Sequence, residues 1–399
     1  MENKNTIVIV SCVFPPEPLV SARISDALAR ELSKDEEVVV LRPAPTRPVG
    51  RTFERKSDGQ DNITIVTLDS YTHPQSSVLG RLRESYSFGK AVSRYIKLNH
   101  TGIKAIYGNT HPTFSQYMLL NAARKFGIPC ALHIQDLYPE SLTSKLGLVG
   151  RLVNPFLLKI DAVYMRKASR LIAISRNMKE TIAGTRSIRE DKIDLVYNWQ
   201  EEQRFLDFKP TESESNKFTF MFLGNLNPTA DIPDIIKAFG LLSDSSARLV
   251  IAGNGSDKAR CIETASLYPD VDIVFTEVLP EGVPALQDKA DVMILSLLKG
   301  ISKTAMPSKL PAYLFSAKPV LACVEEDSDV GNAITESGCG WVVEPENVES
   351  LARQMRKCIS SDRNTLREMG KMGREYGLAN FSANVNLGKL CMAVRKLYE

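Results

Sequence analysis

Several patterns that would assign this sequence to a well-known class are missing from it. The seven cysteines are odd in number and form no CxxC pair, so we expect reduced thiols and neither a disulfide framework nor a zinc site. No run approaches the 18 or so apolar residues of a membrane-spanning helix. The opening MENKNTIVIVSC has too short an apolar run for a signal peptide and leads directly into a strand.

Common catalytic and nucleotide-binding motifs are also missing. Neither GxGxxG nor GxxxxGK[ST] occurs, so dinucleotide and P-loop binding have no support. There is no GxSxG elbow for a hydrolase. A net charge of +3 is too small to indicate a nucleic-acid partner. Asp327-Ser328-Asp329 matches the Asp-x-Asp of metal-dependent sugar transferases, but three residues in an acidic loop carry little weight. The four histidines show no HExxH spacing: His73, His100, His111 and His133.

What the sequence does contain is a repeated strand–helix pattern. Residues 1–200 alternate continuous apolar strands, such as Thr6–Cys12, with amphipathic helices, and residues 218–380 repeat the pattern. The polar, proline-containing residues 201–217 carry neither pattern and are predicted to be a linker. We therefore predict an α/β protein with two doubly wound, Rossmann-like domains. Such domains bind ligands at the carboxyl ends of their strands, and two facing domains would form one cleft.

The stretch Thr304–Ala322 is predicted to be a loop, a short helix and a buried strand. Pro307 ends the preceding segment, Ser308 can cap the helix, and Lys318-Pro319 breaks it. A Ser-Lys pair at a helix start offers N–H groups, a hydroxyl and an ammonium, which suit a phosphate or diphosphate. The alternative is that Ser308 is only a cap and Lys309 only a solvated lysine.

Three other features follow predicted strands and would converge on the same cleft. Gly224-Asn225 and Gly253-Asn254-Gly255 are turns where a backbone could approach a ligand closely, or where the chain only needs to turn tightly. Asp136 and Glu140, on either side of Pro139, could orient a sugar hydroxyl or act as a base. A capping or surface role for these two carboxylates stays open.

The stretch Gly80–Lys104 is strongly basic. Its six cations face Glu84 alone, and Tyr86, Phe88, Tyr95 and Ile96 are interleaved with them. This composition is typical of a helix that lies on an anionic membrane surface. A solvated basic face is the alternative. The cations are Arg81, Arg83, Lys90, Arg94, Lys97 and Lys104.

An ordered series of short segments resembles a known family. Residues 135–141 (QDLYPES) resemble its D-[LW]-[WY]-P-E-S segment, and Tyr197-Asn198-Trp199 its P-N-W segment. Phe222–Asn225, Ile251–Gly255, Ala290–Val292, Pro307–Lys309 and Lys318–Val320 follow at matching spacing, and the FPPEP loop matches the first βα unit. The chain resembles, nearly end to end, the bacterial family-4 glycosyltransferases of GT-B architecture. It is most similar to the branch that builds capsular, O-antigen and colanic-acid-like polysaccharides, which includes N-acetylfucosamine transferases.

This resemblance implies retaining transfer of a sugar from a nucleotide diphosphate sugar, with no protein nucleophile and no metal or other cofactor. Ser308 and Lys309 would hold the diphosphate, and Asp136, Glu140 and Lys309 would be the catalytic residues. Residues 381–399 would form a helix that returns to the first domain. On the acceptor side and between the domains, the implied residues are Pro16, Glu17 and Asn198. The implied donor-binding set is Gly224, Asn225, Gly253, Asn254, Gly255, Glu277, Val278, Pro307, Ser308 and Lys309.

The sequence departs from the family pattern at several positions. Leu19-Val20 stand where many relatives have Gly-Gly, and Asn225 and Ala230 where Arg and Lys are common. The two glutamates spaced E-x7-E are replaced by Thr304 and Ala312. These changes leave open how the donor ribose and sugar hydroxyls are held, and whether the chain has an inactive or regulatory role.

The favoured interpretation is a transferase that uses a UDP-sugar, with an N-acetylated hexose or deoxyhexose as the sugar. The acceptor would be a polyprenyl-diphosphate-linked or oligosaccharide intermediate at the cytoplasmic face of the membrane, where the protein would associate peripherally. One alternative is a sugar-nucleotide 2-epimerase of GT-B fold, which would need several histidines and carboxylates in the cleft. The other is a non-catalytic partner of an active transferase, recognised by tight binding to another chain and no turnover.

Overall fold

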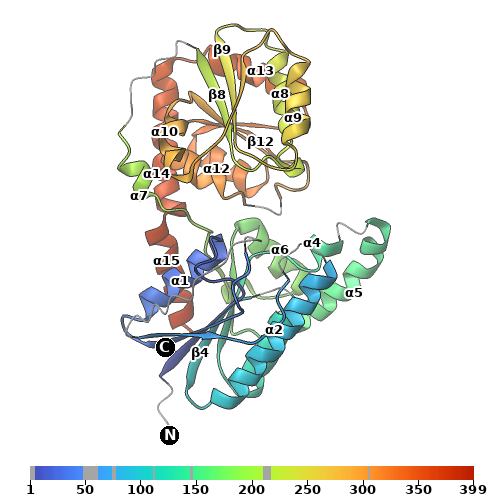
Figure 1. Cartoon of the computed structure of the whole chain (residues 1–399), viewed down its shortest axis with the longest axis vertical. Helices are drawn as coiled ribbons and strands as arrows, with labels where there is room; N and C mark the ends of the chain where they lie inside the picture. Colours follow the sequence, from blue (N-terminus) through green and yellow to red (C-terminus); the bar gives the residue numbers. More distant parts are fainter. Residues whose placement is uncertain are drawn as a thin grey trace. The chain divides into compact units, whose positions relative to one another are not determined.

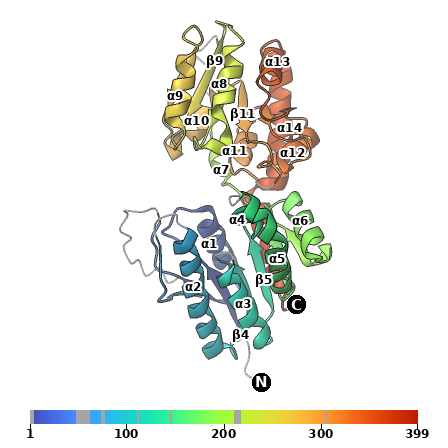
Figure 2. The same ribbon diagram turned by 90° about the vertical axis from the view of Figure 1, so that its right-hand side faces the viewer.

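The protein is described by a computed structural model that covers residues 5–47, 62–73, 78–110, 113–143, 147–209, 217–303 and 306–399. It divides into two compact units: unit 1 comprises Met1–Asn198 and Asn386–Glu399, and unit 2 comprises Trp199–Val385. Each unit contains one parallel sheet covered by helices (Figures 1 and 2). None of the helices in the described ranges is long and apolar enough to cross a membrane. All seven cysteines lie in these ranges and are free.

Unit 1 is built on a seven-stranded sheet in the order β3-β2-β1-β4-β5-β6-β7. Its central strands are largely buried because helices cover both faces of the sheet, as β5 illustrates with all five residues buried. The strands are β1 (Thr6–Ser11), β2 (Glu37–Arg42), β3 (Ile63–Thr67), β4 (Ile103–Asn109), β5 (Cys130–Ile134), β6 (Arg170–Ala173) and β7 (Ile193–Leu195).

The helices of unit 1 form two layers. Figure 2 shows α2, α3 and α5 side by side on one face of the sheet, and α1 and the end of α15 cover the other. Phe88, Val92 and Ile96 of α2 are fully buried in the core. The helices are α1 (Val20–Leu32), α2 (Val78–Asn99), α3 (Phe114–Lys125), α4 (Glu140–Thr143), α5 (Gly147–Met165) and α6 (Arg176–Arg186), with a 3₁₀ turn at Glu190–Lys192.

Unit 2 repeats this design with six strands in the order β10-β9-β8-β11-β12-β13. The strands are β8 (Phe218–Leu223), β9 (Ala247–Ala252), β10 (Ile273–Thr276), β11 (Val292–Ser296), β12 (Val320–Cys323) and β13 (Gly340–Val343). The helices are α7 (Gln203–Leu206), α8 (Ile232–Gly240), α9 (Lys258–Ser266), α10 (Val283–Asp288), α11 (Lys309–Phe315), α12 (Asp329–Ser337), α13 (Val348–Ile359), α14 (Arg363–Phe381) and α15 (Ala383–Arg395), with 3₁₀ turns at Pro228–Ala230 and Pro280–Gly282.

The stretch predicted to be an unstructured linker, residues 201–217, differs from the structure. It contains α7, because Phe205 is buried and its ring centroid lies 6.0 Å from that of Phe315. Residues 210–216 of the predicted linker lie outside the described residues.

The C-terminal part of α15 belongs to unit 1. The Asn386 Oδ1 accepts a hydrogen bond of 3.0 Å from the Tyr197 backbone N–H. Arg395 forms an ion pair with Asp35 at 2.8 Å. The chain therefore completes unit 1 with its last residues, from Asn386 onward.

Candidate functional site

In both sheets the strand order reverses next to the first strand of the unit. The reversal lies between β1 and β4 in unit 1 and between β8 and β11 in unit 2. Doubly wound proteins bind ligands at the carboxyl ends of the strands at such a point. The residues predicted to bind a diphosphate follow β8, β9 and β11, so they lie at this edge of the unit 2 sheet.

The two glycine turns after β8 and β9 pack directly against each other. A Cβ on Gly253 would lie 2.0 Å from the Gly224 carbonyl oxygen, and one on Gly255 would lie 2.1 Å from that of Leu226. The φ of Gly253 is 139°, a conformation that residues with a side chain rarely adopt. Tight packing of one turn on the other therefore explains Gly253 and Gly255 without a ligand.

Gly224 has a different role, because its bare Cα makes room for Lys309. A Cβ at this position would lie 3.3 Å from both Cε and Nζ of Lys309. The Lys309 ammonium lies 4.1 Å from the centroid of the Phe222 ring, a distance at which a cation is attracted to an aromatic face. The end of β8 thus holds the ammonium at the sheet edge.

Lys309 has no ion-pair partner among the described residues. Burial lowers the pKa of its ammonium to about 8, because a partly desolvated cation without a counter-charge is less stable in its charged form. At neutral pH the group is still mostly charged. A half-buried cation that has no counter-charge among the described residues, at the carboxyl ends of parallel strands, is the arrangement expected of an anion-binding residue.

Buried contacts fix the position of the helix that carries Lys309. The Tyr313 hydroxyl donates to the Leu223 carbonyl at 2.8 Å and accepts from the Leu223 N–H at 3.0 Å, which ties α11 to the last residue of β8. On its other side α11 packs against α14, where Gly377 allows close contact with Leu314. The ammonium is therefore placed by rigid elements.

The remaining predicted donor residues are more exposed. Ser308 precedes α11, but its side chain makes no capping hydrogen bond, so its predicted capping role is wrong. Pro307 is half-buried, and Asn225 and Asn254 are exposed. Val278 and Glu277 follow β10, and the exposed Glu277 carboxylate lies 3.9 Å from the Lys258 ammonium. Ala312 is buried in α11, whereas Thr304 lies outside the described residues.

The acidic loop after β12 stabilises neighbouring segments through contacts that the sequence did not predict. The buried Glu325 carboxylate accepts hydrogen bonds from the Gly300 N–H and the Ser302 hydroxyl, which organises the loop after β11. Asp327 pairs with Lys303 at 2.6 Å, and Ser328 caps α12. No group of three His, Cys, Asp or Glu side chains that could hold a metal ion occurs within the described ranges.

At the unit 1 edge, the predicted residues have separate surroundings. Asp136 is an exposed residue that follows β5, and Pro16 is exposed in the loop after β1. Asn198 donates through Nδ2 to the Gln135 Oε1 at 2.9 Å. Glu17 is buried, and its Oε1 accepts the backbone N–H groups of residues 46 and 47, each at 3.0 Å. Glu17 therefore supports a loop, and its predicted acceptor-side role stays a prediction.

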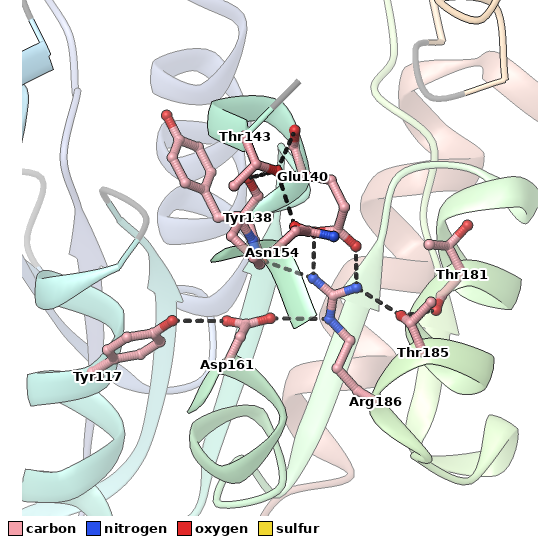
Figure 3. A network of polar contacts seen from close by, with 10 residues as sticks. Tyr117, Tyr138, Glu140, Thr143, Asn154, Asp161, Thr181, Thr185 and Arg186 are labelled. Carbon is pink, nitrogen blue, oxygen red and sulfur yellow. Dashed lines mark hydrogen bonds and ion pairs between the residues drawn. The ribbon is translucent and has the colours of Figure 1, made fainter. Parts of the chain in front are cut away.

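Glu140 is part of a buried polar network centred on Arg186, which is fully buried (Figure 3). The Arg186 Nη2 donates at 2.7 Å to both the Glu140 Oε2 and the Tyr138 carbonyl. Its Nε donates to the Asp161 Oδ2 at 3.0 Å, and burial raises the pKa of Asp161 to about 6 against the opposing effect of Arg186. The carboxylate of Glu140 is thus engaged in an ion pair with Arg186, and its predicted catalytic role stays a prediction.

The network joins three helices to the segment that follows β5. Arg186 ends α6, Asp161 comes from α5, and Glu140 begins α4 (Figure 3). Arg186 binds this segment at the Tyr138 carbonyl and at the Glu140 carboxylate. The segment starts two residues after Asp136. No motif in the sequence predicted the role of Arg186, because the ion-pair partners of a single arginine at a helix end depend on the tertiary fold.

Only some of the cations predicted to form a basic surface on α2 are exposed and could contact a membrane. Arg81 forms an ion pair with the buried Glu84 at 2.9 Å, and Arg47 joins the same carboxylate at 2.8 Å. The Arg83 guanidinium lies 4.2 Å from the centre of the Tyr71 ring. Phe88 and Ile96 face the core, so the prediction that these two residues lie beside the surface cations was wrong. Lys90, Arg94 and Lys97 are exposed.

Comparison with known proteins gives two family matches that follow each other along the chain. Residues 21–204 match the family described as Glycosyltransferase Family 4, and residues 203–376 match Glycosyl transferases group 1. The probable glycosyltransferase WbjE of Pseudomonas aeruginosa is 25% identical over 288 residues, which cover 68% of this chain and 69% of that protein.

Solved structures show the same two-domain fold. A glycosyltransferase from Rickettsia africae ESF-5 has a TM-score of 0.69 at 17% identity, covering 100% of this chain and 99% of the other. Anabaena Alr3699/HepE in complex with UDP also has a TM-score of 0.69, at 14% identity, covering 98% of this chain and 100% of the other. Both units therefore have the Rossmann-like form of the GT-B fold.

Proposed function

We propose that this chain, which matches the glycosyltransferase family 4 and group 1 models in its two halves, is a GT-B glycosyltransferase that transfers a sugar from a UDP-sugar with retention of configuration and without a metal. The observation that carries the proposal is the unpaired Lys309 ammonium at the carboxyl edge of the unit 2 sheet. Anabaena HepE has been solved with UDP and with UDP-glucose, which favours UDP as the nucleotide.

The catalytic demand in such a transfer is negative charge that builds on the departing diphosphate. A fixed cation placed before the reaction stabilises this charge without reorganisation, and each lost donor of this kind typically costs ~3 kcal/mol or about 100-fold in rate. Lys309 would supply the cation, and the exposed hydroxyl of Ser308 beside it would supply a hydrogen bond. Because negative charge on the diphosphate grows as the sugar departs, the Lys309 ammonium would contribute to UDP-sugar binding and would stabilise the transition state still more.

For the acceptor side, we propose that Asp136 orients the incoming hydroxyl. It is an exposed carboxylate at the end of β5, and the Arg186 network fixes the segment that follows it. The proposed acceptor is a lipid-linked or oligosaccharide intermediate of bacterial surface polysaccharide, at the inner face of the membrane. The proposed sugar is an N-acetylated hexose or deoxyhexose.

The 2-epimerase alternative has less support from the described histidines. His133 is buried, and burial lowers its pKa to about 3, so it stays neutral with its Nδ1 bonded to the Tyr107 hydroxyl at 2.7 Å. His100 stacks on Phe126 at 4.4 Å, and His73 contacts Tyr71. His111 lies outside the described residues.

Turnover in the presence of a chelator tests the proposal. The purified chain is incubated with a panel of UDP-sugars and a bacterial polyprenyl-diphosphate sugar fraction, with and without EDTA, and sugar transfer to lipid is measured. We expect transfer from at least one UDP-sugar that EDTA leaves unchanged. Loss of transfer with EDTA, restored by a divalent metal, would overturn the metal-free mechanism. UDP-sugar binding without any transfer would favour the non-catalytic role.

A further inference from the structure

Helix α5 carries an apolar stripe on its outer surface that the described residues of unit 1 leave exposed. Leu152 is 81% exposed, Phe156 66% and Val163 53%. Residues spaced four, seven and eleven positions apart lie on one face of a helix, so these three side chains form one stripe. Single exposed apolar residues are common, but a contiguous apolar group marks an interaction site.

The stripe is outside the core because α5 buries its opposite face. Asp161, Ala162 and Met165 are buried, and Asp161 is bonded to Arg186 in the network of Figure 3. The helix is therefore anchored in a fixed rotation, and the stripe cannot turn inward without breaking that buried ion pair.

The charges beside the stripe have one sign. Lys159 lies within it and Arg151 beside it; both are exposed and have no ion-pair partner among the described residues. Asp161 is the one carboxylate between residues 147 and 165, and it is buried. Apolar side chains surrounded by exposed cations complement a bilayer that contains anionic lipid, where the apolar groups enter the acyl boundary and the cations meet the head groups.

The neighbouring helices extend this surface. α2, α3 and α5 lie side by side in unit 1 (Figure 2). The exposed rings of Tyr86 on α2 and Phe114 on α3 contact edge to face, with their centroids 5.9 Å apart. Lys90 and Arg94 of α2 are exposed on the same stripe as Tyr86. α3 packs against both α2 and α5, so it lies between the exposed cations of α2 and the apolar stripe of α5 (Figure 2).

We infer that α5 is the element of this protein that inserts into a membrane, through Leu152, Phe156 and Val163, onto a bilayer containing anionic phospholipid. The inference deepens the proposed membrane association, which was first indicated for α2, and it does not depend on the identity of the sugar. α2 contributes attraction through its exposed cations, and α5 contributes the apolar contact.

Vesicle flotation of the full-length chain tests this inference. Wild type is expected to float with vesicles of phosphatidylcholine and phosphatidylglycerol, and far less with phosphatidylcholine alone. The double variant Leu152→Ser, Phe156→Ser is expected to bind the anionic vesicles at least tenfold more weakly. Arg151→Gln with Lys159→Gln is expected to weaken binding and to reduce its dependence on salt. Thermal melting followed by circular dichroism, without vesicles, reports that each variant is folded.

A matched control substitutes exposed apolar residues elsewhere. Ile262 and Leu267, on and just after α9 of unit 2, are 48% and 71% exposed, and Ile262→Ser with Leu267→Ser should leave vesicle binding unchanged. Equal loss in the control, or undiminished binding by the α5 variant, overturns the inference. The inference is also overturned if sedimentation shows that the wild type is a dimer, and if the α5 variant is a monomer that still binds vesicles. If the chain binds vesicles but no nucleotide sugar, the proposed function fails and this inference stands.

Discussion

Lys309 shows how strongly the surroundings of one side chain define its chemistry. The sequence placed a lysine after a proline and a serine, which predicted a phosphate site but equally allowed a solvated lysine. The structure adds the Phe222 ring, the space left by Gly224 and the lack of a counter-charge among the residues that it describes. These contacts depend on strands that lie far apart in the sequence, so no local pattern could have shown them.

The lowered pKa of Lys309 predicts how donor affinity depends on pH. The free protein loses the Lys309 proton as the pH rises through about 8, whereas the complex keeps it because the diphosphate stabilises the charged form. The affinity for a UDP-sugar should therefore be constant below pH 7 and fall between pH 8 and pH 9. Isothermal titration calorimetry at these pH values measures it. Lys309→Met should bind more weakly with no such fall, and a parallel fall in both proteins would contradict the assignment.

Gly253 tests the packing of the two glycine turns. Gly253→Ala would place a Cβ 2.0 Å from the Gly224 carbonyl oxygen at a φ of 139°, so we expect destabilisation by about 1–3 kcal/mol. For a unit of this size that corresponds to a drop of a few degrees in melting temperature. Gly184→Ala in α6 is the control, because its Cβ would meet nothing within 4 Å, and it should raise stability slightly. Equal melting temperatures for the two variants would contradict the packing argument.

At the scale of elements, continuous apolar runs and helical spacing predicted most strands and helices of both units. α4, α7 and α12 are exceptions, because the pattern did not indicate them. α7 has only four residues, and its helical form depends on the packing of Phe205 against Phe315, a contact distant in sequence. α12 contains Gly331 and Asn332, which are poor helix formers, and it is stabilised by the Ser328 cap and its buried face.

Arg186 gives a prediction at this scale because it joins α4, α5 and α6. Replacing it by methionine would leave Asp161 and Glu140 with no cationic partner in the network, and breaking a buried ion pair in this way typically costs about 3–5 kcal/mol. We expect a large loss in thermal stability. Arg189→Met is the control: it removes an exposed ion pair with Asp191 and should change thermal stability little.

A positioning role for Arg186 requires a second measurement. Arg186→Lys keeps the charge but cannot bond Glu140, Asp161 and the Tyr138 carbonyl together. We expect transfer to fall at least tenfold with UDP-sugar affinity unchanged, because the donor residues lie in unit 2. If the loss of sugar transfer in Arg186→Lys is no larger than its loss of thermal stability accounts for, Arg186 has a structural role alone.

At the scale of the whole molecule, the sequence predicted two doubly wound units because each half repeats the same strand–helix alternation. It also singled out the Ser-Lys and glycine-turn segments, and their donor-binding roles stay predictions. It did not identify Arg186 or Glu325, and it assigned ligand roles to Glu17 and Glu140. Buried carboxylates and arginines find partners through the tertiary fold, and sequence spacing carries no record of such pairs.

The central claim is that Lys309 holds the diphosphate of a UDP-sugar in a working glycosyltransferase. The most direct test measures the melting temperature of the wild type and Lys309→Met with and without saturating UDP, since a ligand that binds the native state raises its stability. Losing a charge-assisted contact costs ~1.5–3 kcal/mol, or roughly 10–100-fold in affinity. We expect a clear rise in the melting temperature of the wild type and little or none for the variant at the same UDP concentration. An equal rise in both proteins, or none in either, would contradict it.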